Sequence, residues 1–247
     1  MQRSFLWALA ALLLPFTLNA QTIGQSVARA SNGTVRLSFP ARPGVCGNGA
    51  DNISTRRTDE EWESDCEAGP VRVALRVSQG RVLGLRTYVG GRWRQLADVT
   101  DLGIVRPQAA AEYLLSLARL PENLDGDPLL PATLADSITI WPSLLQLARD
   151  DKLPTKRRRS AVFWLSQAAE AAAGNALDSV VSDNSTDREV RKEAVFALSQ
   201  RDPSESVPRL IHVVKTNPDH ELRKAALFWL GQSDDPRALD LFEQLLQ

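Results

Sequence analysis

The chain has 247 residues, is 43% hydrophobic and 24% charged, and carries a formal net charge of -1. This length suits one large domain or two modest ones, and the composition excludes both a charge-swollen disordered chain and a globally basic nucleic-acid binder. With two histidines and one methionine, the chain has little material for a histidine metal cluster or a methionine-rich groove.

Residues 1–20 have the pattern of a secretory signal peptide. Arg3 precedes an apolar run from Phe5 to Phe16, and a short polar stretch ends at Ala20. The run is shorter than the roughly 20 residues that a membrane-spanning helix needs. We therefore expect cleavage after Ala20, export to the periplasm or the extracellular space, and no stable membrane insertion afterwards. An uncleaved anchor is the alternative.

Two cysteines, Cys46 and Cys66, follow the predicted signal peptide. In an oxidising compartment they predict a disulfide, which would close a loop of about 20 residues and stabilise the fold by roughly 3 kcal/mol. A reactive thiol and a zinc site are the alternatives. Neither is favoured, because His212 and His220 lie far along the chain and the two cysteines lack the paired spacing of zinc ligands.

Residues 21–105 predict a small antiparallel β domain. Segments 34–39 and 71–77 alternate apolar and polar residues, as half-buried strands do. Gln79-Gly80 permits a tight turn into a further strand over 81–89.

Two stretches of this domain are rich in glycine. Gly90-Gly91 predicts another turn, leading into Arg92-Trp93, and the segment from Gly44 to Gly69 predicts an irregular loop that the disulfide tethers. No known family is recognised in this domain.

Arginines gather on the polar side of the predicted strands. Residues 21–100 contain eleven arginines, no lysine and eight acids, a net charge of about +3. The candidate ligand-binding arginines are Arg36, Arg72, Arg76 and Arg86. They could bind an anionic ligand or a glycan, or they could simply solvate the open face of the sheet. Nucleic acid is not expected, since no aromatic residues are regularly interleaved for base stacking.

The period of the apolar residues changes after residue 105 to the spacing of three and four that helices show. Three segments align without gaps, at 158–167, 191–200 and 223–232, and their phenylalanines Phe163, Phe196 and Phe228 are 33 and 32 residues apart. An independent set of apolar triplets begins at Leu144, Leu177, Leu210 and Phe242, with steps of 33, 33 and 32. Two ladders that share one period predict stacked helical hairpins, an α-solenoid of about four repeats over 106–247.

Breakers and caps support this division into hairpins. Asp202-Pro203 and Asp235-Pro236 separate the helices of a pair, and Asp219 can cap a helix start. Thr186 and Glu189 have the spacing of a capping box. The first repeat is diverged, because Leu129-Leu130-Pro131 interrupts its first helix.

These repeats resemble HEAT repeats, the short variety also found in phycobilin lyases. The resemblance rests on Arg191, Ala194 and Leu198 before Asp202-Pro203, and on the same pattern one period later. It implies a scaffold for protein interaction. No lyase active site is implied, since no motif for one is present.

The candidate partner-binding residues are Arg158, Arg191, Arg223, Trp164 and Trp229. The arginines recur once per repeat, and they either reach a partner or pair with acids of the neighbouring repeat. The tryptophans serve either as aromatic anchors or as part of the core.

No catalytic residues, metal ligands or cofactors are predicted, because His212 and His220 lack a neighbouring nucleophile or carboxylate arrangement. The prediction is an α+β multidomain protein, an exported, non-catalytic scaffold that binds another protein in the cell envelope. The alternative is an anionic-ligand or glycan binder that uses the arginine face, and an enzyme is the third choice.

Overall fold

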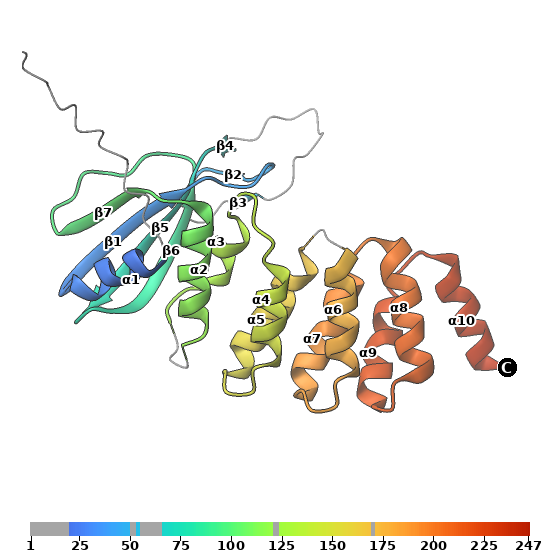
Figure 1. Cartoon of the computed structure of the whole chain (residues 1–247). Coiled ribbons are helices and arrows are strands. Elements are labelled where there is room, and N and C mark those ends of the chain that lie inside the picture. The colour runs from blue at the N-terminus through green and yellow to red at the C-terminus, as the bar shows by residue number, and fades with distance from the viewer. Residues whose placement is uncertain (1–19, 50–52, 55–65, 121–123, 169–170) are drawn as a thin grey trace, which may run out of the picture.

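The structure is a computed structural model that describes residues 20–49, 53–54, 66–120, 124–168 and 171–247. A small sheet region at one end is followed by a row of paired helices (Figure 1). The predicted α+β fold class is therefore confirmed. The predicted signal peptide lies outside the described residues except for Ala20.

The main sheet has four strands in the order β6-β5-β1-β7. Their bounds are β1 Asn32–Phe39, β5 Val71–Ser78, β6 Arg81–Val89 and β7 Val99–Ile104. Strand β5 pairs antiparallel with both β1 and β6, as the alternating pattern predicted, whereas β7 pairs parallel with β1. The edge strand β7 was not predicted, because its residues are largely exposed and show no alternation.

A second, three-stranded sheet lies in the glycine-rich segment, with the order β3-β2-β4. Its strands have two residues each: β2 Cys46–Gly47, β3 Ile53–Ser54 and β4 Glu67–Ala68. The predicted disulfide between Cys46 and Cys66 is present, with the two Cα atoms 5.2 Å apart. The described part of this segment is thus more regular than the loop that the sequence predicted.

One face of the main sheet is apolar and covered. Helix α1, Ala20–Arg29, buries Ile23 and Val27 and contacts both β6 and α2, Pro107–Ala118. The apolar residues at odd positions of β1 and β5, such as Val35 and Val73, are at most 2% exposed. The even-numbered residues, among them the predicted arginines, lie on the other face, so the sheet presents them away from α1.

The remaining helices form the repeat array. Their bounds are α2 Pro107–Ala118, α3 Leu129–Thr133, α4 Trp141–Arg149, α5 Thr155–Ser166, α6 Ala171–Ser182, α7 Arg188–Ser199, α8 Pro203–Thr216, α9 His220–Leu230 and α10 Pro236–Leu246. The first helices α5, α7 and α9 contact one another in succession, and each second helix packs on the first helix of the next pair. The five-residue α3 shows the interruption expected in the first repeat.

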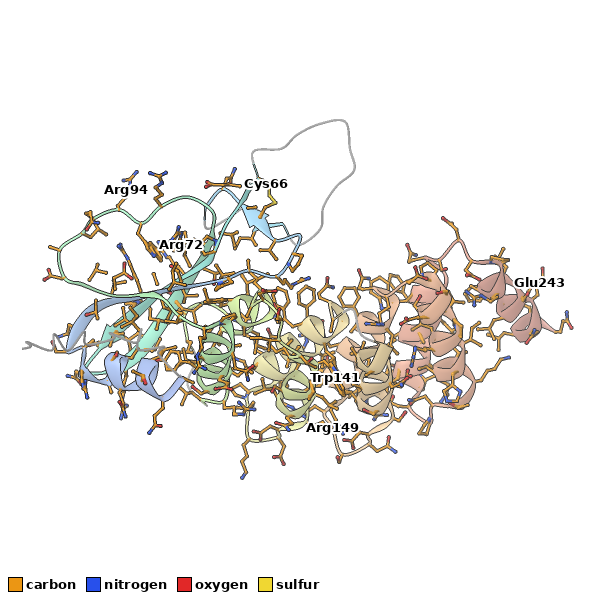
Figure 2. The ribbon with its side chains drawn as sticks, turned by 45° about the horizontal axis from the view of Figure 1, so that its top comes forward. Cys66, Arg72, Arg94, Trp141, Arg149 and Glu243 are labelled. Atoms are coloured by element: carbon orange, nitrogen blue, oxygen red, sulfur yellow. A yellow bond between two sulfur atoms is a disulfide. The ribbon has the colours of Figure 1, made fainter. Side chains whose placement is uncertain are left out.

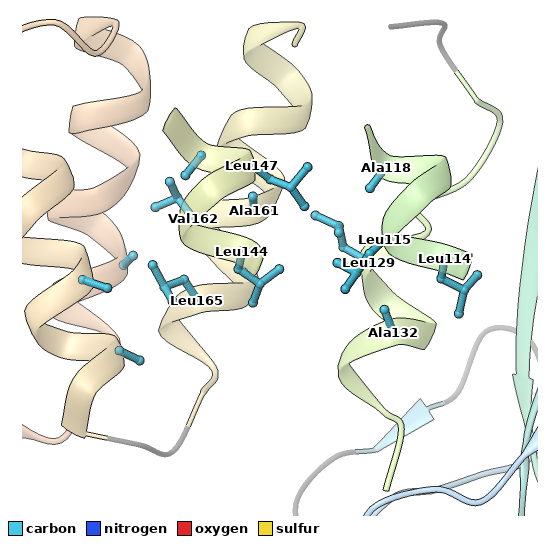
Figure 3. Close-up of a cluster of buried hydrophobic side chains, with 14 of the residues drawn as sticks. Leu114, Leu115, Ala118, Leu129, Ala132, Leu144, Leu147, Ala161, Val162 and Leu165 are labelled. Carbon is cyan, nitrogen blue, oxygen red and sulfur yellow. The ribbon is translucent and has the colours of Figure 1, made fainter. Parts of the chain in front are cut away.

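Stacking buries the apolar ladder that set the period. Leu144, Leu177 and Leu210 are at most 2% exposed. Figure 3 shows Leu144 and Leu147 of α4 pointing toward Leu115 of α2 and Leu129 of α3. The buried residues form one cluster from the sheet to α10. The division into domains at residue 105 stays a prediction.

Aspartates cap the last three helices. The carboxylates of Asp202, Asp219 and Asp235 accept hydrogen bonds from backbone N–H groups two residues on, at 2.8, 2.9 and 3.0 Å. The cap at Asp219 was predicted. The capping box of Thr186 and Glu189 is wrong, because α7 begins after Asp187 and the Thr186 hydroxyl donates to Asp183 instead.

Candidate functional site

Two of the three repeated arginines are buried ties between repeats. Arg158 is 3% exposed, and its Nε donates to the carbonyl of Ala148 at 3.0 Å, while Nη1 donates to Asp187 at 2.5 Å. Arg191 is 5% exposed, and its Nε donates to the carbonyl of Val181 at 3.0 Å. Each arginine thereby satisfies a carbonyl in the last turn of the preceding helix, which has no partner within that helix.

This geometry matches the alternative in which Arg158 and Arg191 pair with acids of the neighbouring repeat, and their role in partner binding stays a prediction. Their guanidinium groups are used inside the array, and Arg191 also lies 3.8 Å from the carboxylate of Asp219 in the next repeat. Arg223 differs, since it is partly exposed and donates to the carbonyls of Asn217 and Pro218 at 2.8 and 2.9 Å. A role of Arg223 in partner binding stays a prediction.

The predicted tryptophans lie beneath a row of phenylalanines. Trp164 is half-buried, and its Nε1 donates to the carboxylate of Asp127 at 3.0 Å. The ring centroids of Trp164 and Phe163 lie 5.0 Å apart. Trp229 is also half-buried, and its ring centroid lies 4.9 Å from that of Phe196 and 5.0 Å from that of Phe228. Both tryptophans therefore pack against neighbouring phenylalanines while remaining partly exposed.

Among the aromatic side chains that the structure describes, Phe163 at 37% and Phe228 at 58% are the most exposed. With Phe196 and Trp229 they form what we call the aromatic row, which crosses the first helices α5, α7 and α9. The sequence revealed these phenylalanines only as markers of the period. Their exposure could not be read from it, because they stand next to apolar core positions on the same helices.

A cavity of about 610 Å³ lies beside the aromatic row, between the last two helix pairs. Val207, Leu210 and Trp229 give it an apolar side, and Asp234 and Asp235 give it an acidic one. Arg237 donates a hydrogen bond to Asp235 and lowers the pKa of that carboxyl to about 2, so Asp235 is charged at neutral pH. Because Arg237 already neutralises Asp235, Asp234 is the carboxylate that could meet a cationic group next to the apolar side of the cavity.

The arginines of the sheet surround one small residue. Arg36 and Arg86 flank Ala74 on the neighbouring strands, and Arg72 and Arg76 lie two residues before and after it on β5. Figure 2 shows Arg72 and Arg94 on the side of the sheet away from α1. The alternation in the sequence thus placed all four predicted arginines on one face.

Three of these arginines line a cavity of about 280 Å³, which we call the arginine pocket. Its lining includes Arg36, Arg76, Arg86, Trp93 and Asp125. Trp93 was not among the predicted residues, and its position beyond the Gly90-Gly91 turn gave no signal that it would fold back.

Arg72 does not line the pocket. It holds the turn after β6, because Nε donates to the carbonyl of Gly90 at 3.3 Å and Nη2 donates to that of Gly91 at 2.9 Å. Arg72 thus has a structural role in this turn, and its role as a ligand contact stays a prediction.

The family model of HEAT repeats matches residues 177–247. This region is an array of HEAT repeats. Helix α5, which lies upstream of the matched residues, and α6 both contact α7, so the stacking of helices continues toward the sheet. A search of curated proteins finds no match to the chain.

The HEAT repeats carry both histidines, and neither belongs to a cluster of metal-binding side chains. His212 and His220 are exposed, and His220 lies 3.4 Å from the carboxylate of Glu221. Within the described residues, no group of three or more histidine, cysteine, aspartate or glutamate side chains could hold a metal ion. None of the helices in that part of the chain is long and apolar enough to cross a membrane.

Proposed function

We propose that this chain is an exported, non-catalytic scaffold whose HEAT repeats bind another protein in the cell envelope. The observation that carries the proposal is the aromatic row. Phe163 on α5 and Phe228 on α9 are exposed, and the half-buried Phe196 of α7 lies on the helix between them. Exposed aromatic side chains of this kind are often buried in protein interfaces, where aromatic residues contribute strongly to the binding energy. HEAT repeats commonly present such extended surfaces to partner proteins.

The partner would combine apolar and basic groups. Residues 101–247 contain seventeen basic and twenty-two acidic side chains, a net charge of about -5. The acidic wall of Asp234 and Asp235 adjoins Trp229 in one cavity. A partner segment with an aromatic or aliphatic residue next to lysine or arginine would complement both features, and its charge would also speed association.

Export is supported by two independent features. The basic start and the short apolar run before Ala20 are typical of a signal peptide. The disulfide between Cys46 and Cys66 suits an oxidising compartment such as the periplasm or the extracellular space. Cleavage after Ala20 would leave the rest of α1 intact.

The test begins with capture of the partner on tagged chain from an envelope extract, followed by binding of the purified partner to the purified chain. The double variant Phe163→Ser/Phe228→Ser should weaken this binding at least tenfold, because it removes two exposed aromatic contacts. Ile104→Ser on β7 is the matched control, since Ile104 is 77% exposed and distant from the row in the sequence. Equal binding by the double variant and the wild-type chain would refute the aromatic row as the interface.

A further inference from the structure

We propose that the arginine pocket is a binding site for a small organic dianion, with a phosphate monoester or a dicarboxylate as the head group. The site is separate from the aromatic row and does not depend on the function proposed above. Its walls come from three strands of the sheet and from Asp125, which precedes α3. Neither the HEAT match nor the fold itself assigns a ligand to it.

The shape of the pocket follows from the strand register. Ala74 lies between Arg36 on β1 and Arg86 on β6, and its methyl group leaves a low floor between two long side chains. Thr34 and Gly84 flank Arg76 in the same way. The resulting volume of about 280 Å³ is at the small end for ligand sites and suits a compact molecule rather than a long chain.

One wall of the pocket is held in place before any ligand arrives. The guanidinium of Arg36 lies 4.6 Å from the centroid of the Trp93 ring, and its Nη1 donates to the carbonyl of Arg94 at 2.9 Å. The Trp93 indole in turn donates to the hydroxyl of Ser38 at 3.3 Å. Arg36 is 8% exposed, so the fold places an oriented cation at the pocket wall.

This buried cation is not fully satisfied. The Nε of Arg36 is buried and has no hydrogen-bond partner among the described residues. A buried donor without an acceptor costs free energy, and a water or an anion in the adjoining pocket would satisfy it. An anion in the adjoining pocket would be attracted by the positive charge of the Arg36 guanidinium. After a small shift of the side chain it could also accept the hydrogen bond of Nε.

The other two arginines are free to respond to a ligand. Arg86 is exposed and has no hydrogen bond or ion pair within the described part of the chain. Arg76 pairs with Asp125 at 3.2 Å, but both side chains are more than 60% exposed, so water screens the pair and a better acceptor can displace it. Guanidinium groups on opposite sides of one pocket match the two acceptor ends of a dianion.

The charge of the pocket sets the charge of the ligand. Three guanidiniums and the carboxylate of Asp125 leave a net charge of +2, which a dianion neutralises. The ring of Trp93, with Tyr88 against it at a centroid distance of 5.6 Å, offers an apolar surface to the carbon part of such a molecule. Inorganic anions would use only the polar half of the site.

The test is isothermal titration of the full chain with inorganic phosphate, with succinate, and with acetate as the monoanion control. We expect a dissociation constant below about 1 mM for at least one dianion at low ionic strength, and weaker binding as salt rises. Binding of phosphate alone assigns a phosphate head group, binding of succinate alone assigns a dicarboxylate, and binding of both supports the shared chemistry. If neither dianion binds more tightly than acetate, the proposal is wrong.

Three variants test the residues. Arg86→Gln should weaken binding about tenfold or more, because it removes a charge-assisted contact without breaking any contact within the fold. Arg81→Gln, an exposed arginine on the same strand outside the pocket, should bind like the wild-type chain. Asp125→Asn should bind several-fold more tightly, since it removes the competing carboxylate and one unit of repulsion.

The sign of the Asp125→Asn effect separates a specific pocket from a generally basic surface. Equal loss in Arg81→Gln and Arg86→Gln, or weaker binding in Asp125→Asn, would overturn the proposal. Thermal unfolding of each variant checks that the fold is intact, and Arg76→Gln replaces Arg86→Gln if that variant unfolds. None of these residues belongs to the aromatic row, so failure here leaves the scaffold function standing.

Discussion

The repeated arginines should contribute to the stability of the helical array, and their contacts predict that Arg158 contributes most, Arg191 less and Arg223 least. Replacement of Arg158 by alanine leaves the buried carbonyl of Ala148 without its donor, a loss of about 1–3 kcal/mol. The buried stem of the side chain adds roughly 0.8 kcal/mol for each methylene that water or a cavity replaces. We therefore expect Arg158→Ala to lower the free energy of unfolding by about 3 kcal/mol.

Arg191→Ala should cost less than Arg158→Ala. Arg191 makes the same bond to a helix-end carbonyl, but its Nη2 is buried without a partner. The carboxylate of Asp219 lies 3.8 Å from Arg191, whereas that of Asp187 lies 2.5 Å from Arg158. Arg223→Ala should cost under about 1 kcal/mol, because Arg223 is partly exposed and bonds only to a nearby loop.

Urea unfolding followed by circular dichroism measures this order. For a chain of this size the free energy of unfolding falls by about 2–3 kcal/mol per molar urea. Arg158→Ala should therefore lower the urea concentration at the unfolding midpoint by about 1 M. Midpoints measured under identical conditions are compared, since repeat arrays need not unfold in a single step. If Arg158→Ala unfolds at the wild-type midpoint, or if Arg223→Ala is the least stable of the three, the arginine ties do not hold the repeats together.

Three further changes probe the rest of the fold. Cys46→Ser should lower stability by roughly 3 kcal/mol, measured against the wild-type chain with and without reductant, and equal melting in both conditions would contradict a stabilising disulfide. Gly126→Ala should lower the free energy of unfolding by about 1–3 kcal/mol, because Gly126 has a φ of +94° and a Cβ there would meet the Leu85 carbonyl. Gly91→Ala should lower it by about 1 kcal/mol or less, because Gly91 has a φ of +61° but open space around it. A lower melting temperature for Gly91→Ala than for Gly126→Ala would contradict this packing. Acid should destabilise the array, because hydrogen bonds from Arg188 and Arg237 lower the pKa of Asp219 and Asp235, the latter to about 2. The stabilisation by these two carboxylates is present above about pH 4 and is lost as the pH falls toward 2. Melting curves at several pH values measure this loss, and a melting temperature that stays constant over this range would contradict it.

The repeat was predictable because its period is fixed by physics that acts along the chain. Each helix pair must bury its apolar stripe on the next pair, so Leu144, Leu177 and Leu210 recur at the spacing of one unit. The same local logic placed β1, β5 and β6, where alternation reports which face is covered.

What the sequence missed depends on contacts between distant segments. Strand β7 pairs with β1 through its backbone, which leaves little trace in its side chains. Helix α1 buries Ile23 and Val27, four residues apart on one face, and this short stripe packs on the sheet and on α2. The burial of Arg158 depends on a carbonyl ten residues earlier and a carboxylate 29 residues later, so recurrence alone could not decide between a surface role and an internal one.

The guanidinium of Arg158 touches three consecutive helix pairs, because it lies on α5, bonds to Ala148 of α4 and reaches Asp187 at the start of α7. A planar group that bonds to all three pairs constrains how one pair packs on the next, and the small rotation from pair to pair gives a solenoid its curvature. The curvature of the exposed surface therefore depends partly on buried side chains that a binding partner would not contact. Lysine would keep the charge but not the planar geometry, so exchanging these arginines for lysines offers a way to straighten or tighten the array without altering its exposed face.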